Sequence, residues 1–153
     1  MSQSWWKPLY KLYAFNGHVA CVHVYSGRFT SKFGSALYLP DKWTRVKGAE
    51  FDLPGKVAKP KSLNKMIKWA KRLSVGIPFV RVDFYDTQKG AVFGECATYP
   101  GRGHVTLPDA LSRSLGQCYH KAARELGLYL PLSQSIPNKP TTNHDDEIEQ
   151  PVV

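Results

Sequence analysis

A β-hairpin is predicted most clearly by residues 81–95, which have the sequence RVDFYDTQKGAVFGE. Two runs of alternating side chains flank the turn-like residues 86–90, and this pattern is typical of two antiparallel strands joined by a short loop. If Thr87 pairs with Ala91 around a three-residue loop, Gly90 takes the left-handed position that such loops favour. The hairpin is the starting point for predicting both the fold and the site.

The same register pairs Tyr85 with Phe93 and Asp83 with Glu95. Two carboxylates that face each other across a ladder destabilise a sheet, and a bound divalent cation would remove that cost. Arg81 lies two residues before Asp83 and therefore projects from the same face. An arginine beside two carboxylates suits a metal-bound polyphosphate. The alternative is a solvent-facing set in which Arg81 neutralises its neighbours, and a register shift of one residue would turn one strand over.

The chain of 153 residues carries a formal charge of +9 that is unevenly distributed. Residues 131–153 hold one lysine against four acidic residues, which is −3, so the first 130 residues carry +12. Such a basic body attracts polyanions, including nucleotides, nucleic acids, anionic glycopolymers and acidic lipid surfaces. Charge alone does not choose among these partners.

Cysteine usage and the N-terminal sequence predict a soluble cytoplasmic protein. Cys21, Cys96 and Cys118 are too widely spaced for a disulfide framework or a metal motif, which indicates a reducing compartment. Cys96 is expected to pack in the core because it alternates with Glu95. We expect no transmembrane segment, since no apolar stretch is long enough for a signal peptide or a membrane span. Contact with a membrane surface or an envelope polymer stays open.

The first half of the chain contains a second hairpin signal and a helix signal. Asn16-Gly17 is a strong two-residue turn between alternating runs in residues 11–25. Residues 26–34 are interpreted as a polar loop, and residues 40–60, with three prolines, as a connector. Ser62 is expected to cap a helix whose apolar side chains recur at three- and four-residue steps, namely Leu63, Met66, Ile67, Ala70 and Leu73.

The second half adds one more helix and a polar tail. A helix is expected from near Thr106, with Pro108 in its first turn, to about Leu128. The proline-rich and acidic composition of residues 131–153 predicts a disordered tail. The order hairpin, connector, helix, hairpin, helix predicts an α+β fold with an antiparallel sheet and packed helices.

Three segments together resemble the TupA-like (teichuronopeptide biosynthesis) branch of the ATP-grasp family. They are KLYAFNG at residues 11–17, the segment 74–85 that contains the Arg-x-Asp motif, and FGECATYPG at residues 93–101. The resemblance covers about Leu9 to Gly116 and matches the carboxy-terminal part of such proteins. It implies the C-terminal lobe of an ATP-grasp fold, so that residues 1–130 form a partial domain whose amino-terminal half is absent.

The resemblance also implies the ligands and the reaction. Asp83 and Glu95 would hold Mg²⁺ on the triphosphate of ATP, and Arg81 would stabilise the transferred phosphate. Arg28 and, more weakly, Lys11 would contact the nucleotide. The implied reaction is ATP-dependent carboxylate–amine ligation through an acyl phosphate, in cell-envelope or capsular polysaccharide biosynthesis. A polymer precursor is then the implied partner.

Two departures from the family pattern affect this expectation. Ala97 stands where many ATP-grasp proteins place an asparagine ligand, which puts a second metal ion in doubt. The amino-terminal half, whose lysines hold phosphates, is expected to be missing through truncation or gene splitting. A complementing chain would then have to supply it, and the isolated chain is expected to be a poor catalyst or inactive.

A noncatalytic basic binding module for nucleic acid or an anionic glycan is the competing function. Trp5, Trp6, Trp43 and Trp69 lie among basic residues, and such aromatics can stack bases while the cations follow phosphates. The two functions differ in what they require. A ligase lobe needs magnesium and both carboxylates, whereas a basic module binds polyanions with a strong salt dependence and without those carboxylates.

Overall fold

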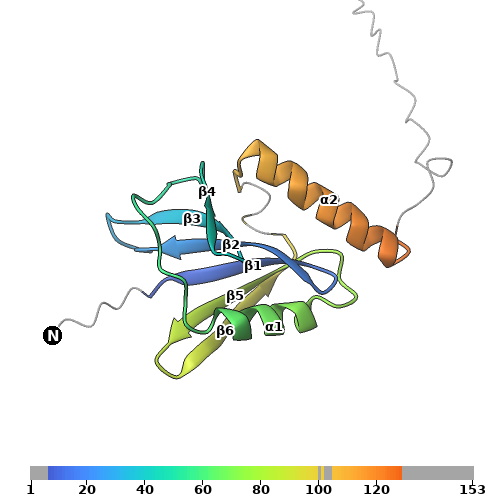
Figure 1. Cartoon of the computed structure of the whole chain (residues 1–153), viewed down its shortest axis with the longest axis horizontal. Helices are drawn as coiled ribbons and strands as arrows, with labels where there is room; N and C mark the ends of the chain where they lie inside the picture. The colour runs from blue at the N-terminus through green and yellow to red at the C-terminus, as the bar shows by residue number, and fades with distance from the viewer. Residues whose placement is uncertain (1–6, 100, 102–104, 129–153) are drawn as a thin grey trace, which may run out of the picture.

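Six antiparallel strands form one sheet, and two helices pack against it, in the computed structural model of residues 7–99, 101 and 105–128 (Figure 1). The elements are β1 (Leu9–Phe15), β2 (His18–Ser26), β3 (Gly34–Leu39), β4 (Thr44–Val46), α1 (Leu63–Leu73), β5 (Val80–Thr87), β6 (Gly90–Ala97) and α2 (Asp109–Glu125). The strand order is β4-β3-β2-β1-β5-β6. The predicted α+β fold with an antiparallel sheet is confirmed.

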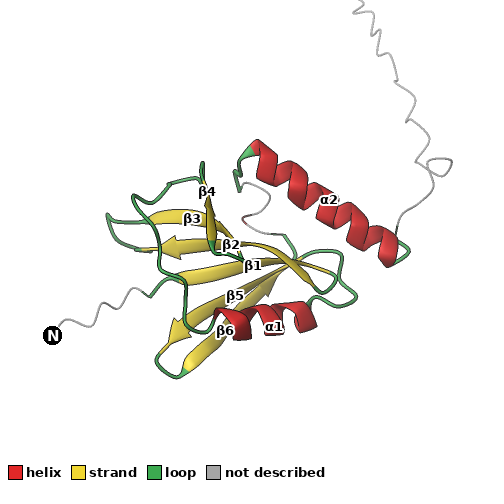
Figure 2. Ribbon diagram, viewed as in Figure 1, coloured by secondary structure: helices red, strands yellow, loops and turns green. Residues whose placement is uncertain are grey.

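The two helices cover opposite faces of the sheet (Figure 2). Successive strand residues point to opposite faces, so each strand contributes to both layers. The α1 face is built from Leu12, Val22 and Val82 together with Met66 and Ala70 of the helix. The α2 face places Tyr13, Phe15, Cys21 and Leu37 against Leu111, Leu115 and Ala122. Neither helix in the described residues is long and apolar enough to cross a membrane.

The β1–β2 hairpin forms at the predicted Asn16-Gly17 turn. Both residues have positive φ, 41° and 83°, as a two-residue turn of this kind requires. Phe15 pairs with His18 next to the turn. The register shifts by one residue between Tyr13 and Ala14, because Ala20 is an extra residue in β2.

The predicted register of the β5–β6 hairpin is wrong by one residue near the turn, but it is correct for the pairs beyond Asp83. Thr87 pairs with Gly90 rather than with Ala91, so the loop has two residues and every pair as far as Phe84–Phe93 is shifted by one. Val82 then pairs with Cys96, because β6 contains one extra residue opposite Asp83. A bulge of this kind cannot be predicted from alternation alone.

Two short strands were not predicted, one between the expected loop and the expected connector and one inside the connector. β3 (Gly34–Leu39) pairs with β2, and β4 (Thr44–Val46) pairs with β3 inside the expected connector, residues 40–60. The sequence of these residues has no strong alternation. β3 forms by pairing with the side of β2 that faces away from β1, and β4 forms by pairing with β3. Trp43 closes the β3–β4 turn with positive φ and stacks on Tyr38, with ring centroids 4.3 Å apart.

The helix bounds agree with prediction better than the helix caps do. α1 has the predicted apolar stripe, but Leu73 is half exposed and Ser62 makes no side-chain capping bond. The Ser62 hydroxyl instead donates to the carboxylate of Asp86, a residue of β5.

Pro108 takes the N-cap position of α2 rather than the first turn, and the helix ends at Glu125, before the expected Leu128. Pro108 lacks a backbone N–H, so it suits a helix start. The tail predicted for residues 131–153 lies outside the described residues, as do Trp5 and Trp6.

Candidate functional site

Four charged side chains from three neighbouring strands form a connected ionic cluster. Lys11 Nζ donates to Asp83 Oδ2 at 2.9 Å. Arg81 binds Asp83 with two donors, Nε to Oδ1 at 2.7 Å and Nη2 to Oδ2 at 2.9 Å. Arg81 Nη2 also donates to Glu95 Oε1. The structure therefore brings together four of the predicted site residues, namely Lys11, Arg81, Asp83 and Glu95.

Strand register explains why these side chains meet. Lys11 stands directly opposite Asp83 in the β1–β5 ladder, and Arg81 projects from the same face two residues away. Glu95 reaches Arg81 because the β6 bulge sets Gly94 and Glu95 together opposite Asp83. A Cβ on Gly94 would lie 3.2 Å from the Asp83 carbonyl oxygen, so glycine lets the bulge pack closely. The expected facing of two carboxylates is thus replaced by a bridge through Arg81.

The cluster is buried at one end and open at the other. Asp83 is 1% exposed and Arg81 is 7% exposed, whereas the Glu95 side chain is 64% exposed. Burial lowers the pKa of Lys11, although the hydrogen bond and the charge of Asp83 oppose this effect. Burial also acts against the charge of Arg81, but Asp83 and Glu95 outweigh it and raise the pKa of the guanidinium. Charge compensation by Asp83 therefore holds two cations in a buried position.

A pocket of about 240 Å³ opens beside the cluster on the face of the sheet that α2 leaves partly uncovered. Lys11, Arg28 and Arg81 supply its positive charge. Its remaining wall consists of three aromatic side chains and two residues of the segment before α2, namely Tyr25, Phe33, Phe51, Gly101 and Val105. Arg28 belongs to the loop after β2 and lines the same pocket as Lys11 and Arg81, and its contact with a nucleotide stays a prediction.

The two carboxylates fit a magnesium ion that is bound mainly through phosphate. Magnesium keeps its place on phosphates through one or two carboxylates plus water. Asp83 already accepts three hydrogen bonds out of about four acceptor positions, so Glu95 is the more available ligand. Ala97 faces Arg81 in the ladder and adds no ligand. Within the described residues, no group of three His, Cys, Asp or Glu side chains could hold a metal by itself.

His23 lies beside the ionic cluster and was not among the predicted site residues. It stands opposite Lys11 in the β1–β2 ladder, is 1% exposed, and has neither ring nitrogen hydrogen-bonded within the described part of the chain. Burial, followed by the charges of Lys11 and Arg81, lowers the pKa of His23 to about 4. The spacing of residues in the sequence could not place His23 beside Lys11 and Arg81, because these two residues come from other strands.

Cys96 is exposed, which contradicts the expectation that it packs in the core. It does alternate away from Glu95, but β6 is an edge strand and the helices leave this end uncovered. Burial still raises the pKa of its thiol, and the charges of Asp83 and Glu95 add to that effect.

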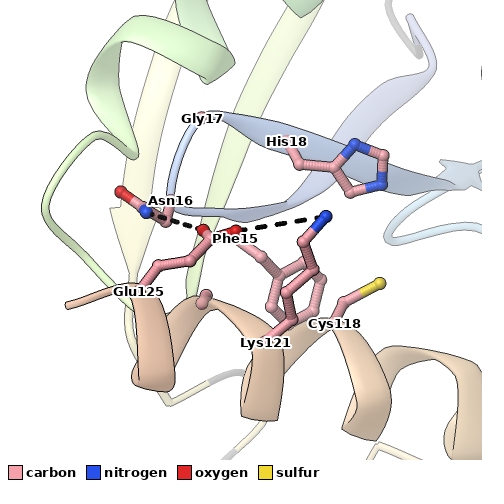
Figure 3. A pocket seen from close by; sticks show the side chains of 8 residues that line it. Phe15, Asn16, Gly17, His18, Cys118, Lys121 and Glu125 are labelled. Atoms are coloured by element: carbon pink, nitrogen blue, oxygen red, sulfur yellow. Dashed lines mark hydrogen bonds and ion pairs between the residues drawn. The ribbon is translucent and has the colours of Figure 1, made fainter. Parts of the chain in front are cut away.

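A second pocket, of about 280 Å³, lies at the opposite end of β1 between the Asn16-Gly17 turn and α2 (Figure 3). Asn16 Nδ2 donates to Glu125 Oε2 at 3.1 Å, and Lys121 Nζ lies 4.0 Å from Glu125 Oε1. Figure 3 shows His18 across the space from Lys121. This pocket contains none of the four residues of the ionic cluster.

The structure defines an α+β protein that has an antiparallel sheet, a helix on each face and a pocket lined by three cationic side chains. The family model described as TupA-like ATPgrasp matches residues 7–120. The chain therefore belongs to the TupA-like ATP-grasp family, as the resemblance of its motifs predicts. Searches of curated proteins and of solved structures found no significant match.

Proposed function

We propose that this chain provides a phosphate-binding lobe for ATP-dependent carboxylate–amine ligation in the cytoplasm. The supporting observation is the buried Lys11–Asp83–Arg81 network, which reaches Glu95 and opens onto a pocket with Arg28. Three cations at one pocket suit a polyphosphate, and membership of the ATP-grasp family favours ATP as its source.

In the proposed reaction a carboxylate oxygen attacks the γ-phosphorus of ATP, and the bond from that phosphorus to the ADP oxygen breaks. An amine nitrogen then attacks the acyl carbon, releases phosphate and loses a proton to give an amide. Arg81 and Lys11 would neutralise the charge that develops on the transferred phosphate, and Arg28 would orient the chain of phosphates. Magnesium, held by Glu95 and Asp83, would supply Lewis-acid stabilisation of the phosphate oxygens.

Asp83 has a separate part in this proposal. Its three accepted hydrogen bonds fix Lys11 and Arg81 in place before a ligand arrives. Fixed donors stabilise developing charge better than donors that must reorganise during the reaction. A complementing chain that supplies further phosphate contacts, and a precursor of an envelope or capsule polymer as substrate, complete the proposed function.

The test is calorimetric titration of the folded chain with a nonhydrolysable ATP analogue, with and without Mg²⁺. We expect Glu95→Gln to abolish the magnesium dependence, because its exposed carboxylate is the more available ligand. Glu125→Gln is the matched control, since Glu125 is a partly exposed carboxylate in the second pocket. No binding by a folded chain would contradict a self-sufficient ATP site.

The basic binding module stays as a second candidate because the first 130 residues carry a formal charge of +12. In the same titration, a basic module would bind with an affinity that changes neither with Mg²⁺ nor with Glu95→Gln. Such binding would also weaken steeply with added salt, because counterions are released from the polyanion. Titration with single-stranded nucleic acid and with an anionic glycan would then identify the partner.

A further inference from the structure

An open apolar hollow of about 380 Å³ lies between α1 and the edge strand β6, on the face of the sheet that α1 covers (Figure 1). Trp69, Leu73 and Phe93 line it together with Arg72. Leu73 is 45% exposed and Phe93 is 48% exposed. Apolar surface gains free energy when it leaves water, so a partner that covers this hollow would gain binding free energy from it.

The solvent-facing side of α1 carries only positive charge, because the helix contains no acidic residue. Lys65, Lys68 and Arg72 are exposed and follow one another at three- and four-residue steps, which places them along one side of the helix. Lys65 Nζ lies 4.7 Å from the centroid of the Trp69 ring, so the row of cations borders the hollow directly. We refer to the three cations and the three apolar side chains as the α1 patch, namely Lys65, Lys68, Arg72, Trp69, Leu73 and Phe93.

The α1 patch adds little to the stability of the fold. Like charges four residues apart, such as Lys68 and Arg72, destabilise a helix. Within the described part of the chain, none of the three cations forms an ion pair. Exposed apolar side chains that gather beside unpaired charge are typical of a surface that binds a partner.

We propose that the α1 patch docks the chain on an anionic lipid bilayer. Clustered lysines and arginines are attracted to the negative surface of such a bilayer. Tryptophan, phenylalanine and leucine side chains beside those cations enter the boundary between headgroups and acyl chains. A bilayer therefore complements both parts of the patch, whereas a hydrated anionic polymer would pair with the cations and leave Leu73 in water.

Docking through α1 is compatible with use of the pocket beside the ionic cluster. The helices α1 and α2 cover opposite faces of the sheet (Figure 2), and Lys11 and Arg81 face the α2 side. A chain that lies on a bilayer through α1 keeps that pocket open to solvent. The proposal does not depend on phosphate binding there, so each can fail without the other.

Vesicle co-sedimentation of the full chain tests the proposal. One set of vesicles contains phosphatidylcholine alone, and the other contains equal parts of phosphatidylcholine and phosphatidylglycerol. We expect binding to the anionic vesicles only. The combined substitutions Lys65→Gln, Lys68→Gln and Arg72→Gln should weaken that binding by about hundredfold, because each cation close to an anionic surface contributes about fivefold.

The matched control removes the same charge elsewhere, through Lys42→Gln, Lys47→Gln and Arg113→Gln. These cations are also exposed, and they lie outside α1 and β6. Only a small loss is expected from the lower net charge. Equal weakening in the two triple variants would overturn the assignment of binding to the α1 patch.

The apolar part of the patch is tested by Phe93→Ser, which should weaken binding to the anionic vesicles by about fivefold. Val92→Ser is its control, because Val92 is 46% exposed but points to the opposite face of β6. We expect Val92→Ser to bind as the wild type does. Thermal melting of each variant checks that the chain is folded.

Three results would overturn the proposal. Equal binding to neutral and anionic vesicles would show that charge does not select the surface. Loss of binding in the α1 triple variant without any effect of Phe93→Ser would indicate a site for anionic polymers, which titration with single-stranded nucleic acid would then measure. A dimer in light scattering that Phe93→Ser dissociates, without vesicle binding, would show that a second copy of the chain covers the patch.

Discussion

The two faces of the sheet are built from the same strands but differ in what they bury. Under α1, Leu12, Val22 and Val82 are fully buried in a continuous apolar layer. Under α2, the apolar layer around Tyr13, Phe15 and Leu37 gives way along β1 and β5 to the ionic cluster around Asp83 and Arg81. The α1 face is thus an ordinary apolar core. On the α2 face, apolar side chains at one end of β1 and β5 are replaced by charged side chains at the other end.

This difference shows how β1 serves two purposes. Leu12 and Ala14 face α1, whereas Lys11 and Tyr13 face the opposite side. Burial of apolar surface on the first face stabilises the fold, which allows the second face to hold charges that a core would not tolerate. The cost of those charges is limited because each cation has a carboxylate partner.

Asp83→Asn should break this balance most severely. The substitution leaves Lys11 and Arg81 buried without their shared counter-charge, and removing one partner from a buried ion pair costs about 3 to 5 kcal/mol. Urea unfolding should show that loss in the free energy of unfolding. Asp41→Asn, at an exposed position, should change stability by less than about 0.5 kcal/mol. Equal stability of the two variants would show that the cluster is not effectively buried.

The free energy of unfolding should fall in acid because His23 is buried and uncharged in the folded chain. Its folded pKa of about 4 lies below the ordinary value near 6.5 of an unfolded chain, so the unfolded state binds more protons between these values. The free energy of unfolding should therefore fall by up to about 3 kcal/mol as pH decreases from about 6.5 to about 4. His23→Leu should flatten this difference and, by removing two unpaired buried nitrogens, raise stability at neutral pH. Urea unfolding at a series of pH values checks both, and parallel pH profiles would contradict the prediction.

Two glycine substitutions should have smaller effects of opposite sign. Gly94→Ala places a Cβ 3.2 Å from the Asp83 carbonyl oxygen and should cost about 1 kcal/mol by crowding the bulge. Gly116→Ala, in the middle of α2, places a Cβ where no other described atom lies within 4 Å. It should instead stabilise the helix by about 0.5 to 1 kcal/mol. Thermal unfolding measures both, and a gain in stability for Gly94→Ala would indicate that the bulge tolerates a side chain.

Part of the candidate site could be predicted from sequence because its geometry is local. Arg81 and Asp83 share a face through strand alternation, and Arg81 does contact Asp83. Glu95 is predicted to face Asp83 from a turn register that is off by one residue, and the β6 bulge restores the offset so that Glu95 lies near the pair and contacts Arg81. The roles of Lys11, Arg28, Arg81, Asp83 and Glu95 in binding stay predictions.

The Asn16-Gly17 turn, the alternation of β1 and β5 and the apolar stripe of α1 could be predicted because each depends on residues a few positions apart. The contact of Lys11 with Asp83, 72 residues away, and the position of His23 opposite Lys11 in β2 follow only from the pairing of strands in the folded chain. Tertiary structure also decided that Phe51 stands beside the cations, through hydrogen bonds to β3. The physical reason is that a turn or a helix stripe depends on neighbouring residues, whereas the order and register of strands depend on which pairing buries the most apolar surface over the whole chain.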